Sequence, residues 1–137
     1  MPANTTANFP VTPKIGVGSI IATANTALNG TGTVATLFTA GANGSKVDYI
    51  LIKHTGTSIA TLVRIFINNG GATSTASNNS LFMDQLIPAY TLSQTASQPD
   101  EYTIGLDIAL PAGYKITATI GTTVAAGLTF SVYGGDY

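Results

Sequence analysis

Short runs of alternating apolar and polar residues, separated by turn residues, fill most of the chain. The clearest run covers residues 101–108. Its apolar positions are Tyr102, Ile104, Leu106 and Ile108. A period of two is typical of a strand with one buried face. The same pattern recurs at residues 114–120 and 128–133, so the C-terminal part of the chain predicts three half-buried strands.

Further strand-like runs precede these three. They cover residues 14–24, 33–40, 46–54, 59–67 and 81–87. Gly16 and Gly18 interrupt the first run, which indicates a bulged or edge strand. The turn at residues 41–44 contains Gly and Asn, which accept positive φ, and therefore predicts a hairpin between the second and third runs. The third run is apolar on both faces apart from Asp48, as in a central strand covered on each side.

About eight strands and no helical apolar stripe predict an all-β fold. A two-sheet β-sandwich is the best architecture for this number of strands. Jelly-roll connectivity is preferred because it commonly has eight strands. The sequence leaves an immunoglobulin-like strand order open as the alternative.

The N-terminal residues have a different composition. Pro2, Pro10 and Pro13 lie among Asn and Thr, and this composition resists both helix and central strand. We therefore expect an extended N-terminal arm at residues 1–13 and a single β-sandwich domain at residues 14–137, consistent with a length of 137 residues.

The small number of charged residues changes the functional picture. Only 8% of residues are charged and the formal net charge is -1, where a soluble domain typically has about 25% charged residues. So few charges give little electrostatic protection against association. We expect much of the surface to be covered by other proteins.

Composition also argues against several classes of partner and site. Five Lys and Arg residues spread along the chain cannot neutralise several phosphates at once, so no nucleic-acid partner is expected. The absence of Cys excludes disulfides and thiolate metal sites. The first residues lack the features of a secretory signal, and no apolar stretch approaches the roughly 20 residues of a membrane span, so neither export by that route nor a membrane association is expected.

Candidate catalytic and metal-binding groups are sparse. His54 is the only His, and we interpret it as a strand-end imidazole near the surface, because no Gly-x-Ser-x-Gly motif accompanies it. Asp100 and Glu101 are adjacent, so on a strand they point to opposite faces and do not form a catalytic pair. Together with Asp84 they could converge on calcium, but solvated surface charges explain them better. We expect no catalytic, cofactor or metal site, and no enzyme activity.

Two cations interrupt otherwise apolar strands. Lys53 and Arg64 each lie within such a run. A charge in this position either faces a carboxylate of a partner or extends to water. Both interpretations remain open from the sequence.

Several short segments carry a resemblance to a known group of proteins. They are Thr12-Pro13-Lys14-Ile15-Gly16, Thr23-Ala24-Asn25-Thr26, Gly30-Thr31-Gly32-Thr33-Val34, Phe38-Thr39-Ala40-Gly41-Ala42-Asn43-Gly44-Ser45, Arg64-Ile65-Phe66-Ile67-Asn68-Asn69-Gly70, Leu110-Pro111-Ala112-Gly113-Tyr114 and Gly134-Gly135-Asp136-Tyr137. With these segments the chain resembles small virion proteins of tailed bacteriophages. By analogy with decoration or cement proteins, which often form trimers at symmetry axes, the resemblance implies a sandwich domain displayed on the capsid. It carries over no catalytic or metal-binding residues.

The expected function is therefore that of a phage head decoration (cement) protein. It would be made in the cytoplasm of the bacterial host, bind the major capsid protein on the outer surface of the virion capsid, stabilise the head and associate with itself as a homotrimer. The residues expected to contact the capsid or other subunits are Pro2, Phe9, Pro10, Pro13, Arg64 and Tyr137.

Two other functions remain as alternatives. The first is a phage tail or fibre module that binds host-surface glycans through loop residues 68–79 and Tyr90. The second is a hydrolase that uses His54.

Overall fold

The described part of the chain folds into eight strands and one short 3₁₀ turn. The computed structural model describes residues 9–99 and 102–137. The elements are β1 (Thr12–Ile21), β2 (Ala35–Thr39), β3 (Ser45–His54), β4 (Thr61–Asn68), the 3₁₀ turn η1 (Ala76–Asn78), β5 (Asn79–Ile87), β6 (Thr103–Leu110), β7 (Lys115–Ile120) and β8 (Leu128–Asp136).

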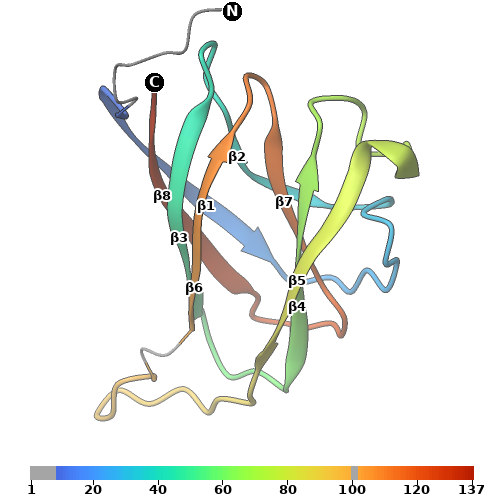
Figure 1. Cartoon of the computed structure of the whole chain (residues 1–137). Helices are drawn as coiled ribbons and strands as arrows, with labels where there is room; N and C mark the ends of the chain where they lie inside the picture. The colour runs from blue at the N-terminus through green and yellow to red at the C-terminus, as the bar shows by residue number, and fades with distance from the viewer. Residues whose placement is uncertain (1–8, 100–101) are drawn as a thin grey trace, which may run out of the picture.

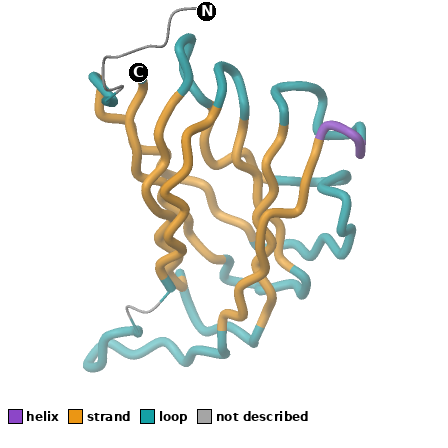
Figure 2. The backbone as a smooth tube through the Cα atoms, viewed as in Figure 1, coloured by secondary structure: helices purple, strands orange, loops and turns teal. Residues whose placement is uncertain are grey.

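The strands form two four-stranded antiparallel sheets that face one another (Figure 1). One sheet has the order β1-β8-β3-β6 and the other has the order β2-β7-β4-β5. The backbone is almost entirely strand and loop (Figure 2). The predicted all-β, two-sheet sandwich is confirmed.

Each sheet contains two pairs in which a strand from the first half of the chain lies beside one from the second half, and these pairs are joined by the ladders β3-β8 and β4-β7. β1 pairs with β8, β2 with β7, β3 with β6 and β4 with β5. Only the last of these pairs joins consecutive strands. From β1 to β4 the chain passes alternately between the two sheets, so nearly every strand takes its hydrogen-bonded neighbours from a distant part of the sequence.

The predicted hairpin at residues 41–44 is wrong. The turn itself exists, and Gly44 N donates a hydrogen bond to Gly41 O at 3.1 Å. However, β2 pairs with β7, whereas β3 pairs with β6 and β8. The turn therefore carries the chain from one sheet to the other. Gly and Asn provide the backbone conformation of the turn, but they do not decide which strands pair after it.

β3 is a central strand, as predicted, but only one of its faces is covered. Val47, Ile50 and Ile52 are fully buried between the sheets, whereas Asp48 and Tyr49 are exposed. A register shift between Val47 and Tyr49 interrupts the simple alternation. The apolar residues on the outer face of β3 therefore lie on a surface that no other part of the described chain covers.

β1 is the bulged edge strand that its glycines predict. It lies at the end of its sheet, and its register with β8 shifts between Gly16 and Ser19. A Cβ atom on Gly16 would lie 2.2 Å from Leu37 O, so glycine permits this close approach to β2. β1 begins at Thr12, and Pro13 is paired with Gly135. The last two residues of the predicted arm thus belong to the sheet, on an edge that tolerates proline.

The space between the sheets is filled by branched aliphatic and aromatic side chains. Its fully buried members include Ile50, Ile65, Ile116 and Val132, and Phe130 is 1% exposed. The half-buried alternation predicted for the C-terminal part of the chain is confirmed for β6 and β8, where Ile104 and Phe130 point into this core. It is wrong for β7, which is covered on both faces: Ile116 is in the core, and Thr117 and Thr119 on the other face are only 0% and 1% exposed. Burying one face of each strand is the main source of stability in such a sandwich.

Replacement of two isoleucines tests this arrangement. We expect Ile50→Ala to lower the free energy of unfolding by about 2 to 5 kcal/mol, because it leaves a cavity in the core. Ile20→Ala, at a position 61% exposed, is expected to change it by less than about 0.5 kcal/mol. Urea unfolding of the purified variants measures both values. Equal losses would contradict the assignment of the two faces.

Candidate functional site

The residues expected to make contacts fall in two separate places. Pro2 lies outside the described residues. Pro10 and Pro13 lie beside the end of β8, where they line a pocket of about 370 Å³ together with Val11, Lys46, Asp48, Gly134 and Gly135. Phe9 precedes them and is 72% exposed. Arg64 lies in the other sheet, on β4.

Tyr137 follows β8 and is held near this first pocket by its backbone. Tyr137 N donates a hydrogen bond to Gly44 O at 3.1 Å, and Asn43 Nδ2 donates to Tyr137 O at 3.4 Å. The structure therefore brings Pro10, Pro13 and the C-terminal segment together at one end of the β1-β8-β3-β6 sheet.

A carboxylate near the C-terminus ties both ends of the domain to the turn between β2 and β3. Asp136 accepts hydrogen bonds from Ser45 Oγ and from Lys14 Nζ, the latter at 3.2 Å. Lys14 Nζ also donates to Thr39 O at 2.5 Å and lies 5.0 Å from the centre of the Phe38 ring. Lys14 and Asp136 thus join β1, β2, β3 and β8.

Three of the segments that carry the phage resemblance meet at this cluster. They contain Lys14, the turn residues from Gly41 to Ser45, and Asp136. The hydrogen bond from Ser45 holds the pKa of Asp136 below its usual range, and Lys14 lowers it further against the opposing effect of burial. These segments therefore have a structural role. The sequence alone does not reveal this cluster, because its members are far apart in the chain.

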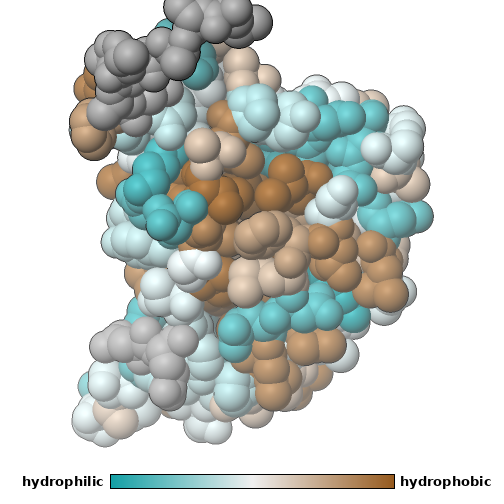
Figure 3. Space-filling model, in the orientation of Figure 1, coloured by the Kyte–Doolittle hydropathy of each residue, from teal (hydrophilic) through white to brown (hydrophobic). Residues whose placement is uncertain are grey.

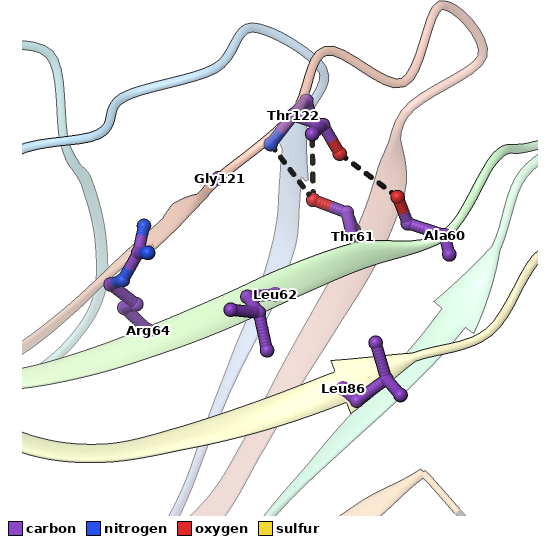
Figure 4. Close-up of a pocket in the computed structure, with 7 residues that line it drawn as sticks. All are labelled: Ala60, Thr61, Leu62, Arg64, Leu86, Gly121 and Thr122. Atoms are coloured by element: carbon purple, nitrogen blue, oxygen red, sulfur yellow. Dashed lines mark hydrogen bonds between the residues drawn. The ribbon is translucent and has the colours of Figure 1, made fainter.

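Arg64 lies in a second pocket, on the outer face of the β2-β7-β4-β5 sheet. The pocket has a volume of about 240 Å³ and is lined by Ala60, Thr61, Leu62, Arg64, Leu86, Gly121 and Thr122 (Figure 4). Thr122 N donates a hydrogen bond to Thr61 Oγ1 at 3.0 Å, and Thr122 Oγ1 donates to Ala60 O at 3.0 Å. These bonds fix one wall of the pocket.

The guanidinium of Arg64 is largely buried. Its side chain is 14% exposed, and Nε and Nη1 have no hydrogen-bond partner. Asp84 lies directly opposite on β5, with 3.7 Å between Arg64 Nε and Asp84 Oδ1. This distance exceeds hydrogen-bond range, so the contact is only an ion pair through space.

The same sheet face is covered on one half only. Phe66 is fully buried but is not part of the core between the sheets. It is covered by the connection between β1 and β2, since a Cβ atom on Gly30 would lie 3.1 Å from Phe66 Cδ1. At the other half, Ile59, Leu62 and Leu86 remain 59%, 38% and 54% exposed.

Hydrophobic side chains are visible at the surface of the molecule as well as inside it. Figure 3 shows them gathered between the two sheets and over the side that carries β4 and β5. Leu81 and Phe82 on β5 are each 41% exposed. An apolar surface of this kind is more typical of an interface than of a free surface.

His54 is not near the surface, contrary to the sequence interpretation. It ends β3 as predicted, but it is only 5% exposed. Its ring stacks on Tyr90 with 4.9 Å between ring centres and meets the edge of Tyr102 at 5.7 Å. Gln98 exchanges two hydrogen bonds with the His54 backbone. The connection between β5 and β6 thus covers the imidazole, which the local sequence around His54 did not indicate.

Ser58 is the hydrogen-bond partner of this imidazole. Ser58 Oγ lies 2.6 Å from His54 Nδ1, whereas His54 Nε2 has no hydrogen-bond partner. A catalytic Ser-His pair needs a third group to orient the base and a path for substrate. Neither residue lines the two pockets above, and Ser58 is 7% exposed. We interpret the pair as an internal contact that holds the connections at this end of the sandwich.

The loop residues proposed for glycan binding already use much of their hydrogen-bonding capacity inside the protein. Asn68 Nδ2 donates to Asn79 Oδ1 at 2.8 Å, and Asn69 Nδ2 donates to Asn78 Oδ1 at 3.3 Å. Tyr90 is occupied by its stacking on His54. The asparagines of this loop therefore serve to hold the loop together through hydrogen bonds between their side chains.

Within residues 9–99 and 102–137, no group of three or more His, Asp or Glu residues could hold a metal ion. Of the three carboxylates considered for calcium, Asp84 is on β5, and Asp100 and Glu101 lie outside the described residues. In the same part of the chain, no helix has the length and apolar character needed to cross a membrane.

Stability should depend on pH through His54. Burial lowers the pKa of His54 and the charge of Lys53 lowers it further. The folded state therefore binds fewer protons than the unfolded state, whose His pKa is about 6.5, and stability is lost as the pH falls below that value toward the folded-state pKa. Urea unfolding between about pH 5 and pH 7.5 should show a smaller pH dependence for His54→Gln. Equal slopes in both proteins would refute this.

Asp136 should also lose its stabilising effect as the pH falls, but at lower pH than His54. Its folded-state pKa lies below the unfolded value of about 3.9, so its stabilisation is complete above that pH and is lost as the pH falls through the folded-state pKa. We expect Asp136→Asn to destabilise the protein by about 1 kcal/mol at neutral pH and by less at about pH 2.5. Asp48→Asn is the control, because the Asp48 carboxylate is 54% exposed and its ion pair with Lys46 is 3.5 Å long. A loss of stability in Asp136→Asn that does not change with pH would contradict the assignment.

Known proteins give no further assignment. The chain matches no protein-family model, no curated protein and no solved structure. The assignment of function therefore rests on the residues, the fold and the two surface pockets.

Proposed function

We propose that this protein is a bacteriophage capsid decoration protein that binds the major capsid protein and stabilises the head. The observation that carries this proposal is the number of large apolar side chains left exposed on strands of both sheets. They include Ile15, Val17 and Ile20 on β1, Leu62 on β4, and Leu81, Phe82 and Leu86 on β5. Exposed apolar side chains in a protein with only 8% charged residues are typical of a surface that another protein covers permanently.

The few charges support the same proposal. Lys14 pairs with Asp136, and Lys46 pairs with Asp107 at 2.9 Å and with Asp48 at 3.5 Å. The hydrogen bond to Asp107 is the largest of the contacts that raise the pKa of Lys46. Charges that neutralise each other do little to keep copies of the chain apart. Repetition of one apolar contact at many symmetric positions can then stabilise a shell.

We infer further that the sandwich is a jelly roll. The support is the pairing of β1 with β8, β2 with β7, β3 with β6 and β4 with β5, which is the pairing of one long hairpin rolled into two sheets. Such a domain leaves the outer faces of both sheets available, one for the capsid and one for neighbouring copies. Association as a homotrimer is part of this proposal.

Binding to heads that lack this protein tests the proposal. We expect the purified protein to co-sediment with them and to appear in cryo-electron microscopy as density on the outer surface of the capsid. Density in the tail, or none on the particle, would rule out the capsid assignment, and density on tail fibres would favour the glycan-binding alternative. Sedimentation of the free protein at micromolar concentration should show a trimer. A monomer would refute the proposed homotrimer.

A substitution on the apolar face gives a sharper test. Leu86→Asp places a charge on an exposed position of β5, and we expect it to weaken binding to heads by at least about tenfold. Ser74→Asp, which adds the same charge in the exposed connection between β4 and β5, is the matched control and should bind like the unmodified protein. Circular dichroism checks that both variants remain folded. Equal binding of both would show that this face is not the interface.

A further inference from the structure

The pocket at Arg64 combines a small volume with an unsatisfied cation. Its volume of about 240 Å³ is below the roughly 300–1,000 Å³ of pockets that hold drug-sized ligands. A pocket of this size accommodates one amino-acid side chain rather than a sugar chain or a nucleotide. The occupant is therefore best sought among single side chains of another protein.

Buried polar atoms without partners gather on the same sheet face. Arg64 Nε and Nη1 have no acceptor, and Thr119, which lies directly opposite Arg64 on β7, has no partner for Oγ1 although it is 1% exposed. Buried donors without acceptors are costly, and a buried cation is more so. Of these residues only Arg64 lines the open pocket, so its guanidinium is the group that an acceptor from another protein can approach.

The carboxylate of Asp84 does not meet this need. Asp84 lies 3.7 Å from Arg64 Nε and its side chain is 47% exposed, so it is shared with solvent. By contrast, Lys14 and Lys46 approach their carboxylates within 3.2 Å and 2.9 Å. An arginine is charged at every physiological pH, so its guanidinium cannot become neutral and is stabilised by a nearby anion.

Packing holds the guanidinium in one place. Gly121, at the end of β7, has no side chain, and a Cβ atom there would lie 3.2 Å from Arg64 Nη1. The head of Arg64 extends toward Gly121, Leu62 lies next to Arg64 along β4, and Leu86 lies beyond Leu62 on β5 (Figure 4). A fixed guanidinium binds a carboxylate with little loss of side-chain entropy.

We propose that this pocket binds the carboxylate of an Asp or Glu side chain of a partner protein, with apolar groups of the same partner segment packed on Leu62 and Leu86. A single cation matches the single negative charge of a carboxylate, whereas a phosphate would require more donors. The apolar rim of Ile59, Leu62 and Leu86 extends beyond the pocket and excludes water from the pair, as at the centre of a protein interface. Identification of the partner as the capsid subunit rests on the proposed function, but the carboxylate site does not.

The site is directly observable because Arg64 is the only arginine in the chain. Its Nε–H group gives a single resonance in a ¹H–¹⁵N spectrum. We expect 3-methylbutanoate, a carboxylate with a branched apolar end, to shift this resonance and the backbone amides of Leu86 and Thr122 in a saturable way. The neutral amide 3-methylbutanamide should do so at least about tenfold more weakly. Equal responses to both compounds, or a response to inorganic phosphate alone, would overturn the proposal.

Variants of the pocket separate binding from folding. Leu86→Glu places a carboxylate on β5 diagonally from Arg64, within reach of its side chain. We expect this variant to move the Arg64 Nε–H resonance without ligand and to abolish the response to 3-methylbutanoate, whereas Leu86→Gln should retain the response. Arg64→Met should abolish the shifts at Leu86 and Thr122, and Lys115→Met, on the same sheet, should not. If Leu86→Glu still responds like Leu86→Gln, the pocket is not a carboxylate site.

The same variants distinguish this inference from the proposed function. We expect Arg64→Met to weaken binding to heads at least tenfold and Lys115→Met to leave it unchanged. If Arg64→Met binds heads and associates with itself as well as the unmodified protein does, the role of Arg64 is refuted while the capsid function stands. No binding by the unmodified protein, together with a positive titration, would refute the capsid function and leave the carboxylate site. If self-association is lost in Arg64→Met while binding to heads persists, the partner is a second copy and not the capsid subunit.

Discussion

The structure depends on hydrogen bonding between strands that are far apart in the chain. β1 pairs with β8 and β2 pairs with β7, so neither sheet is complete until its most C-terminal strand has joined its first one. The cluster of Lys14, Ser45 and Asp136 lies where these distant segments meet. It provides charge-assisted hydrogen bonds at the point where the two ends of the domain would otherwise separate.

This pairing also determines which surfaces are left open. Several strands carry apolar residues on both faces, but each strand has only one face inside the sandwich. On the outer face of the β2-β7-β4-β5 sheet, the connection between β1 and β2 covers Phe66, while Leu62 and Leu86 stay exposed. Arg64 lies at the border between the covered and the open half, which explains its partial burial and its lack of hydrogen-bond partners.

The pocket near Pro10 and Pro13 and the pocket at Arg64 differ in chemical character. The one near Pro10 and Pro13 is bordered by the Lys46 and Asp48 ion pair and by the C-terminal segment, whose charges are already matched. The pocket at Arg64 is bordered by leucines and contains a cation whose hydrogen bonds are unmet. The second is the better candidate for a specific contact, because an unsatisfied charge in an apolar surface selects its partner by chemistry as well as by shape.

The sequence by itself determined the local structure. Alternation at residues 102–108, 114–120 and 128–133 predicts the strands, and the glycines of β1 predict its bulge, because period and backbone freedom are properties of neighbouring residues. Arg64 could also be singled out, as a charge within an apolar run. Tertiary structure alone decided that the turn at residues 41–44 joins two sheets, that His54 is buried against Ser58 and Tyr90, and that Lys14 meets Asp136. Each of these depends on which distant strands pair and which connection folds over them, and that choice is made by the packing of the whole core.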